Sequence, residues 1–115
     1  MITIYGISNC DTIKKTRAWL KDAGVPHDFH DYRKDGITES LVETFLARFT
    51  LEELINRRGT TWRKLPETVR EALTPESAVT VMLENPALIR RPILTDGNHW
   101  LLGFDPQAIQ QTLTS

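Results

Sequence analysis

The chain has 115 residues, of which 40% are hydrophobic and 25% are charged, and its formal net charge at pH 7 is −1. This length and composition fit a single globular domain with its own core. The near-neutral charge argues against a surface for nucleic acid or for an anionic membrane, and no apolar run reaches the length of a membrane span. The N-terminus also lacks the basic and apolar segments of a secretory signal.

The first third of the sequence predicts a strand, a helix and a second strand. Residues Ile2–Gly6 form a short apolar run, and apolar residues recur at helical spacing over residues 12–23. Gly24 and Pro26 are typical of a helix end. Residues 27–32 alternate but carry many polar side chains, which indicates an edge strand or a strand beside a groove.

Cys10, the single cysteine of the chain, stands where the first strand passes into the helix. A thiol at a helix N-terminus feels the positive end of the helix dipole and unpaired backbone N–H groups, and both favour the thiolate. Such positions lower a cysteine pKa from about 8.5 to about 3.5–7.5, and the thiolate is the nucleophile. The alternative is a structural cysteine that packs as a small core residue.

A lone cysteine also sets the redox chemistry that is open to the chain. It cannot close an internal disulfide, which favours a cytoplasmic location, where thiols stay reduced. Any redox cycle at Cys10 must therefore take its second thiol from another molecule.

Three polar residues, Asn9, Asp11 and Thr12, surround Cys10 in the sequence. Their backbone N–H groups are expected to cradle an anion, as helix N-termini do. Thr12 has a structural alternative as a helix cap. A carboxylate facing the sulfur would oppose thiolate formation, so Asp11 is expected to point away and to cap the helix or pair with a neighbouring lysine.

The middle of the chain predicts several helices. Residues 38–49 carry apolar side chains at i, i+3 and i+4. Thr50 and Glu53 form a capping-box pattern at the start of a short helix, which Gly59 is expected to end. Two further helices, each with an early proline, are expected over residues 66–73 and 75–83.

The last third predicts a β-hairpin and a final helix. Residues 93–95 and 100–102 flank a turn at residues 96–98, and Asp105 is expected to cap the closing helix. A βαβ unit implies a parallel pair of strands, and the hairpin adds antiparallel ones. The expected architecture is an α/β fold, a mixed four-stranded sheet flanked by helices. It forms one domain over residues 1–115 with a helical insertion at about residues 38–86.

This order of elements is similar to the thioredoxin fold, and three segments resemble the arsenate-reductase-like (ArsC/Spx) family. They are residues 5–10 with Cys10, residues 88–93 with Arg91 and Pro92, and residues 103–105. The resemblance extends over essentially the whole chain and is greatest to the YffB-type branch. Members of that branch are described as glutathione-dependent thiol reductases.

The resemblance implies roles for three residues beyond Cys10. Pro92 is expected to be cis and to lie beside the thiol, leaving the backbone of the preceding residue to pair with a peptide or glutathione. That residue, Arg91, matches the anion-binding arginine of the family, and Arg58 matches a second arginine that faces the cysteine. The structural alternatives are a surface ion pair for Arg91 and a solvated helix end for Arg58.

Two departures from the family pattern argue against arsenate reduction. The arsenate reductases carry a histidine four residues before the cysteine, where this chain has Gly6, and a third arginine after the hairpin, where it has residues 103–105. Fewer cations compensate a doubly charged oxyanion less well. Ile13 also replaces the second cysteine of the Cys-x-x-Cys switch of Spx-type regulators, so that switch is absent.

The favoured hypothesis is a monothiol reductase with glutathione as its co-substrate and an unidentified thiol, disulfide or oxyanion as its substrate. Cys10 would be the nucleophile, and Arg91 and Arg58 would bind carboxylates. The alternative is a non-catalytic interaction module, because Spx-type relatives bind RNA polymerase. No metal is expected, since the histidines lack the spacing of zinc ligands relative to Cys10.

Overall fold

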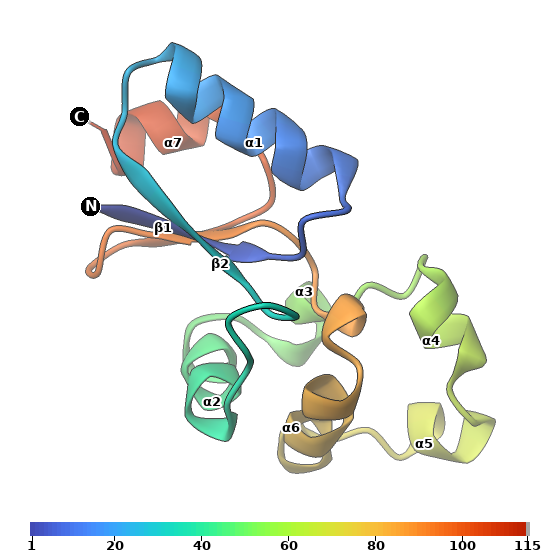
Figure 1. The fold of residues 1–115 in the computed structure, drawn as a ribbon. Coiled ribbons are helices and arrows are strands. Elements are labelled where there is room, and N and C mark those ends of the chain that lie inside the picture. Colours follow the sequence, from blue (N-terminus) through green and yellow to red (C-terminus); the bar gives the residue numbers. More distant parts are fainter. Residues whose placement is uncertain (115) are drawn as a thin grey trace. The chain divides into compact units, whose positions relative to one another are not determined.

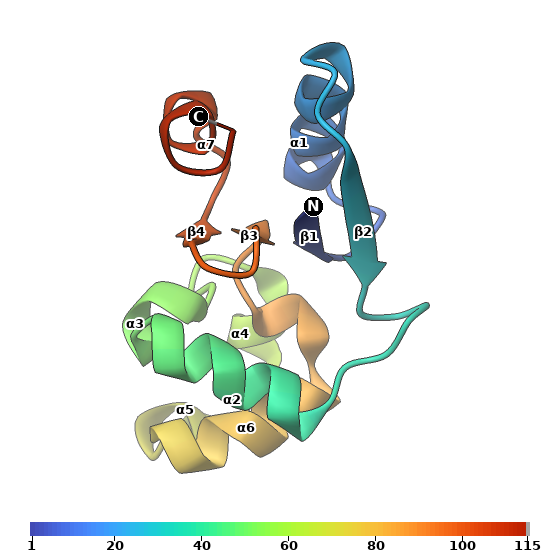
Figure 2. The same cartoon turned by 90° about the vertical axis from the view of Figure 1, so that its left-hand side faces the viewer.

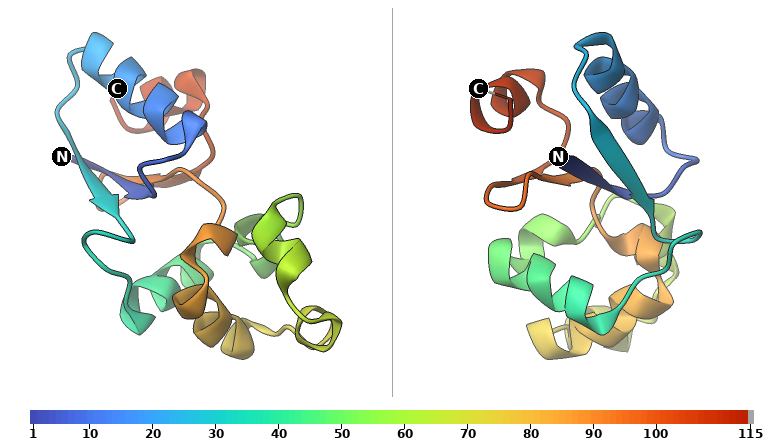
Figure 3. Two further views of the ribbon diagram at one scale, coloured as in Figure 1. Left: turned by 45° about the vertical axis from the view of Figure 1, so that its right-hand side comes forward. Right: turned by 60° about the vertical axis from the view of Figure 1, so that its left-hand side comes forward.

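The computed structural model describes residues 1–114, and their internal contacts divide them into two units. The first unit comprises residues 1–35 and 91–114 and contains the sheet. The second comprises residues 36–90 and is helical. Figures 1 and 3 show the elements of each unit, coloured along the chain.

A mixed four-stranded sheet organises the first unit, as the sequence predicts. The strand order is β2-β1-β3-β4, with β1 parallel to β2 and antiparallel to β3, and β3 antiparallel to β4. β2 is an edge strand, in agreement with its polar composition. The strands are β1 (Ile2–Gly6), β2 (His27–Asp31), β3 (Ile93–Thr95) and β4 (Trp100–Leu102).

Two helices, α1 (Asp11–Asp22) and α7 (Pro106–Thr112), lie on the same face of this sheet (Figure 2). Each begins as the sequence predicts: α1 follows Cys10, and the Asp105 carboxylate accepts hydrogen bonds from the backbone N–H groups at the start of α7. Gly24 follows α1 with a φ of 70°, which suits glycine. The shared core consists of Ile2, Ile4, Ile13, Leu20, Leu94 and Ile109.

Burial of these apolar side chains is the main force that holds α1 and α7 to the sheet. Each fully buried side chain of this size contributes about 1.5–3 kcal/mol relative to an exposed one. Because Ile13 lies three residues after Cys10, the same packing that fixes α1 also fixes the helix end that carries the thiol.

The second unit is built around two packed helices, α2 (Glu39–Arg48) and α6 (Pro75–Glu84). Phe45 of α2 and Met82 of α6 are fully buried. An isolated antiparallel bridge joins Ile55 to Ile89. The shorter helices are α3 (Leu51–Leu54), α4 (Thr60–Lys64), α5 (Glu67–Glu71) and a 3₁₀ turn at Pro86–Leu88.

The capping box at Thr50 is confirmed: its hydroxyl accepts from the N–H of Glu53, and the Glu53 carboxylate accepts from the N–H of Thr50. The expectation for Gly59 is wrong. α3 already ends at Leu54, and Gly59 is instead the N-cap of α4, a helix that the sequence analysis did not predict. Glycine is favourable both at helix ends and at N-caps, so its presence alone does not distinguish the two.

Within the described part of the chain, no helix combines the length and apolar character that a membrane span needs.

Candidate active site around Cys10

Cys10 is the N-cap residue of α1. Its backbone is extended, with φ −129° and ψ 125°, and its carbonyl accepts the first helical hydrogen bond from the N–H of Lys14 at 3.0 Å. The thiol is partly exposed. The backbone N–H groups of Thr12 and Ile13, which have no helical partner at this end, lie close enough to the sulfur to lower its pKa, although the side chain forms no capping hydrogen bond. The site therefore presents an accessible sulfur to two donors.

Opposing influences set the pKa of the Cys10 thiol. Partial burial, the largest single influence, raises the pKa, whereas hydrogen bonds from the N–H of Ile13, the Arg91 side chain and the N–H of Thr12 lower it together with the Arg91 charge. The net effect is a pKa below the ordinary value of a cysteine. The local structure thus favours the thiolate, the form that acts as a nucleophile.

The sheet topology explains why Arg91 reaches Cys10. β3 runs antiparallel to β1, so the start of β3 lies beside the end of β1, where the loop to Cys10 begins. Arg91 is separated from β3 by Pro92 alone, and the Arg91–Pro92 peptide bond is cis, as the family resemblance implies. The carbonyl of Pro92 accepts from the N–H of Gly103 at 2.8 Å, which ties this bend to the end of the hairpin.

Gly6 leaves no room for a side chain at the position where the arsenate reductases carry histidine. A Cβ atom there would collide with Cδ1 of Ile13 and lie 3.0 Å from its Cγ1 and 3.7 Å from Cδ of Arg91. Ile13 is fully buried. A histidine at position 6 would therefore require the buried side chain of Ile13 to shift.

The segment after the hairpin has structural roles in place of a third arginine. Gly103 has a φ of 91°, a conformation that suits glycine. Phe104 packs against the core of the first unit, and Asp105 caps α7. In this part of the chain the fold itself accounts for the departure from the arsenate-reductase pattern.

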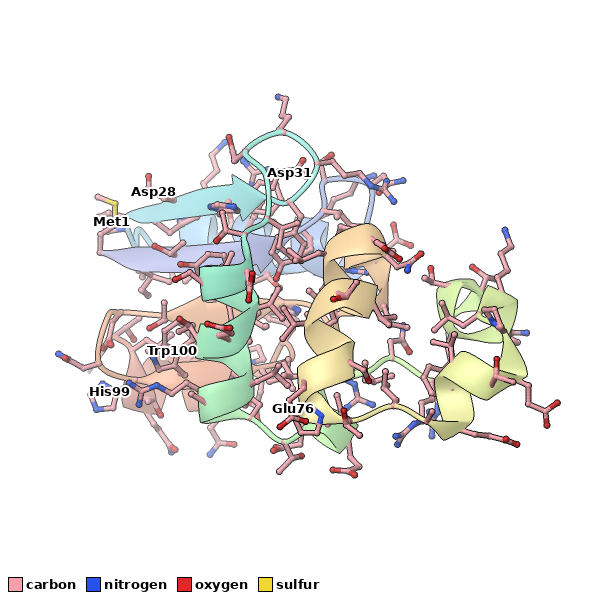
Figure 4. The ribbon with its side chains drawn as sticks, turned by 90° about the horizontal axis from the view of Figure 1, so that it is seen from below. Met1, Asp28, Asp31, Glu76, His99 and Trp100 are labelled. Carbon is pink, nitrogen blue, oxygen red and sulfur yellow. The ribbon has the colours of Figure 1, made fainter. Side chains whose placement is uncertain are left out.

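Asp31, at the end of β2, holds the loop that leads to Cys10 and was missed by the sequence analysis (Figure 4). The residue is only 3% exposed. Its carboxylate accepts from the N–H of Arg33 at 2.9 Å and from the hydroxyl and N–H of Ser8. Burial raises the pKa of Asp31, but these hydrogen bonds outweigh it, and the net pKa is lowered.

A backbone hydrogen bond reinforces this anchor, from the N–H of Tyr32 to the carbonyl of Gly6 at 2.9 Å. The end of β2 thus fixes the two residues on either side of Ile7. The signal for Asp31 was present in the sequence: a carboxylate closes the strand that runs parallel to the strand before the cysteine. The prediction of an edge strand or a strand beside a groove for residues 27–32 gave no separate role to this carboxylate.

The other predicted residues of the cysteine loop have different surroundings. Asn9 is exposed, and its Oδ1 accepts from Nη1 of Arg33 at 3.4 Å. Asp11 is exposed in the first turn of α1. Among residues 1–114 it neither caps the helix, whose N-cap is Cys10, nor pairs with a lysine, so both alternatives expected for it are wrong. Thr12 does not cap α1, because Cys10 occupies that position.

Arg58 belongs to the second unit, in the exposed turn between α3 and α4. Its N–H donates to Oδ1 of Asn56 at 3.2 Å, and its carbonyl accepts from Nη2 of Arg63 at 3.0 Å. These bonds fix the backbone of the turn and leave the guanidinium for other contacts. That Arg58 faces Cys10 stays a prediction.

Among residues 1–114 there is no cluster of three histidine, cysteine, aspartate or glutamate side chains that could hold a metal ion. Two of the histidines have local contacts instead. Nδ1 of His27 lies 2.9 Å from the carbonyl of Val25, and Nδ1 of His99 lies 3.1 Å from the carboxylate of Asp96.

Sequence comparison identifies relatives over nearly the whole chain. The sequence profile of the ArsC family matches residues 5–112. An uncharacterized protein of Haemophilus influenzae is 44% identical over 110 residues, 96% of each chain. The global transcriptional regulator Spx 1 of Lactococcus lactis is 31% identical over 98% of this chain and 89% of its own.

Solved structures show the same architecture. A protein named YffB superposes with a TM-score of 0.92 at 40% identity, covering 98% of this chain and 99% of its own. An arsenate reductase of Vibrio cholerae shares the fold with a TM-score of 0.81 at 18% identity, covering 97% of both chains. With its matched profile, its lone helix-capping cysteine and this sheet, the chain belongs to the ArsC family and has its thioredoxin-like fold.

Proposed function

We propose that the protein is a monothiol reductase that uses Cys10 as its nucleophile and glutathione as its co-substrate. The observation that carries this proposal is the partly exposed thiol at the N-cap of α1, whose pKa is lowered by backbone N–H groups and by Arg91 against the opposing effect of burial. A stabilised thiolate that is open to solvent is the requirement for attack on a disulfide.

The proposed cycle has two thiol–disulfide exchanges. The Cys10 thiolate attacks the glutathione sulfur of a mixed disulfide; a bond forms between the two sulfurs, and the substrate sulfur leaves with the electron pair and takes a proton from water. A second glutathione thiolate then attacks the glutathione sulfur of this adduct, which releases oxidised glutathione and the Cys10 thiolate. A lowered pKa makes Cys10 a good leaving group in this second step.

The residues around Cys10 suit the binding of glutathione, which carries two carboxylates on an extended backbone. Arg91 beside the sulfur is suited to bind a carboxylate in bidentate fashion, and Arg58 is the second such group in the proposal. The backbone next to Pro92 would pair with the peptide groups of glutathione. The N–H groups of the cysteine loop, from Asn9 to Thr12, would complete the cradle.

A coupled assay tests this function directly. The protein is given 2-hydroxyethyl disulfide and glutathione, and glutathione reductase with NADPH reports the oxidised glutathione formed. We expect turnover by the wild type, its loss in Cys10→Ser and its retention in Lys15→Gln, an exposed substitution on the same helix. A separate alkylation experiment first shows whether Cys10 of the wild type reacts as a thiolate. If it does, and the unmodified wild type still gives no turnover in the coupled assay, glutathione dependence is contradicted.

The second candidate function is that of an interaction module, favoured by the 31% identity with the Spx 1 regulator over 98% of this chain. Such a module needs a surface and not a thiolate. We expect Cys10→Ala to abolish the reductase reaction, and if the module hypothesis is correct the same variant binds RNA polymerase as well as the wild type does. A pull-down with purified polymerase distinguishes the two functions.

A further inference from the structure

A groove beside α1 remains unassigned by the proposed reaction. It has a volume of about 660 Å³ and runs between α1 and the segment that leads into β2. Its accessible apolar lining includes Ala18, Val25 and Pro26, and Ile13 lies buried beneath them. The volume lies within the range of sites that bind small ligands.

Three cations line this groove: Lys14, Arg17 and Lys21. They follow one another at i, i+3 and i+7, so they share one face of α1, and all three are exposed. Arg17 is held by its contact with Phe29, with Cζ 4.6 Å from the ring centroid. No acidic residue lies among the groove-lining residues described in the structure.

The spacing of these cations selects the class of ligand. At about 1.5 Å of rise per residue, Lys14 and Lys21 are about 10.5 Å apart along the helix axis, so the three charges do not converge on one point. A compact oxyanion would reach one or two of them. An extended peptide with acidic side chains matches the whole stripe, because alternate side chains recur about every 6.6 Å on one face.

A nucleic acid fits this surface less well than a peptide. The adjoining cavity shares Ser8, Arg17 and His27 with the groove, but it is also lined by three carboxylates, Asp28, Asp31 and Asp35, against one further cation, Lys34, so it would repel a continuous phosphate backbone. The chain as a whole carries a net charge of −1. A short acidic segment that stays over the groove residues does not have to extend along Asp28, Asp31 and Asp35, as a continuous phosphate backbone would.

We propose that the groove lined by Lys14, Arg17 and Lys21 binds an extended acidic segment of a protein partner. Ser8 and Ile13, two residues before and three residues after Cys10 in the chain, are among the residues that line the groove. If the proposed function holds, a segment bound there brings the partner's own disulfide or thiol to the Cys10 end of α1. That consequence rests on the proposed reductase function, whereas binding of the segment does not.

Fluorescence anisotropy with a labelled peptide tests the proposal. The probe is a peptide of about ten residues in which glutamate alternates with alanine, long enough to span the stripe. Its control has glutamine at every glutamate position. The protein is Cys10→Ser, so that disulfide exchange cannot contribute to binding and a failure of the reductase function leaves this result unaffected.

Two double variants of equal charge distinguish the effect of the groove cations from that of cations elsewhere on the surface. Lys14→Gln/Lys21→Gln removes two groove cations and leaves Arg17 on Phe29, whereas Lys15→Gln/Lys64→Gln removes two exposed lysines that do not line the groove. We expect saturable binding of the acidic peptide. The double variant of the groove lysines should lower the affinity about fivefold, and the double variant of the control lysines should lower it less than about twofold. Exposed ion pairs of modest strength give changes of this size.

Three results would overturn the proposal. The first is no saturable binding of the acidic peptide by the Cys10→Ser protein. The second is an equal loss of binding in both lysine pairs, which would indicate a general effect of charge. The third is binding of a single-stranded oligonucleotide of equal charge that is tighter than that of the peptide and equally sensitive to the groove pair.

Discussion

The sulfur of Cys10 is stabilised from two directions that have different origins in the sequence. The N–H groups of Thr12 and Ile13 come from the helix that starts at the cysteine, and so follow from local sequence. Arg91 comes from the other end of the chain, through the pairing of β3 with β1. The first contribution could be predicted from position alone, whereas the second required the family resemblance.

Replacing Arg91 tests the second contribution. In Arg91→Ala the sulfur loses a hydrogen bond and an adjacent positive charge, so we expect the pKa of Cys10 to rise towards that of a free cysteine. The ultraviolet absorbance of the thiolate, followed with pH, measures this change. Lys15→Ala removes an exposed cation from α1 and should leave the curve in place; an equal shift in both variants would argue against a direct contact.

Asp31 provides a prediction about stability and pH. Hydrogen bonds to the loop lower the pKa of its carboxyl in the folded state, so its contribution to stability is present above the unfolded pKa of about 3.9 and is lost as the pH falls through the folded value. We expect Asp31→Asn to lower the free energy of unfolding by about 1 kcal/mol at pH 7, as measured by urea unfolding. The difference from wild type should shrink below about pH 3.9; a constant difference would show that ionisation is not involved.

At the scale of elements, the packing of β1 against α1 determines whether a side chain fits at position 6. Gly6→Ala is expected to destabilise the protein by about 1–3 kcal/mol, because its Cβ overlaps the fully buried Ile13. Urea unfolding gives the value. The variant Ile13→Val removes the overlapping Cδ1 atom and provides the matched partner for a double-mutant cycle.

Alone, Ile13→Val should cost about 0.5–1.5 kcal/mol. In the Gly6→Ala background it should cost less or restore stability, since it relieves the overlap. Additive effects of the two changes would contradict a steric origin. The cycle is informative for function as well, because the N–H of Ile13 lies close enough to the Cys10 sulfur to lower its pKa.

Helix starts that are marked by two residues together could be predicted from the sequence, whereas a helix start marked by one glycine could not. Thr50 with Glu53 specifies a helix start from both sides, and Asp105 with Pro106 does the same for α7. α4 has only five residues and begins at Gly59, a residue equally compatible with a helix end. Local sequence therefore gave no basis for choosing between these two roles.

For the whole molecule, the mixed four-stranded sheet could be predicted from the sequence, since βαβ and hairpin signals leave few arrangements, whereas the strand order comes from the structure. Only part of the candidate site could be predicted from the sequence. The Arg91 side chain and the N–H of Thr12 lie at Cys10, and their roles in binding stay predictions, whereas the buried Asp31 with Ser8 was overlooked. Contacts between side chains distant in the sequence carry no periodic signal, so sequence patterns did not reveal them.

The single-domain organisation, with an insertion at about residues 38–86, remains a prediction at this scale. It requires that the units of residues 1–35 with 91–114 and of residues 36–90 unfold together. Native-state hydrogen exchange measures this at Ile4 and Phe45, fully buried residues of the two units. We expect the same free energy of opening at both amides; a clearly lower value at Phe45 would indicate an independently unfolding insertion.

The reactivity of Cys10 is the central claim, and the pH dependence of its alkylation by iodoacetamide tests it most directly. Intact mass reads the reaction without ambiguity because the chain has one cysteine. The structure predicts complete modification in the folded state with a midpoint below that of the same cysteine in the urea-unfolded protein. A midpoint at or above that value, or no reaction until the protein unfolds, would contradict the catalytic account and favour an interaction module.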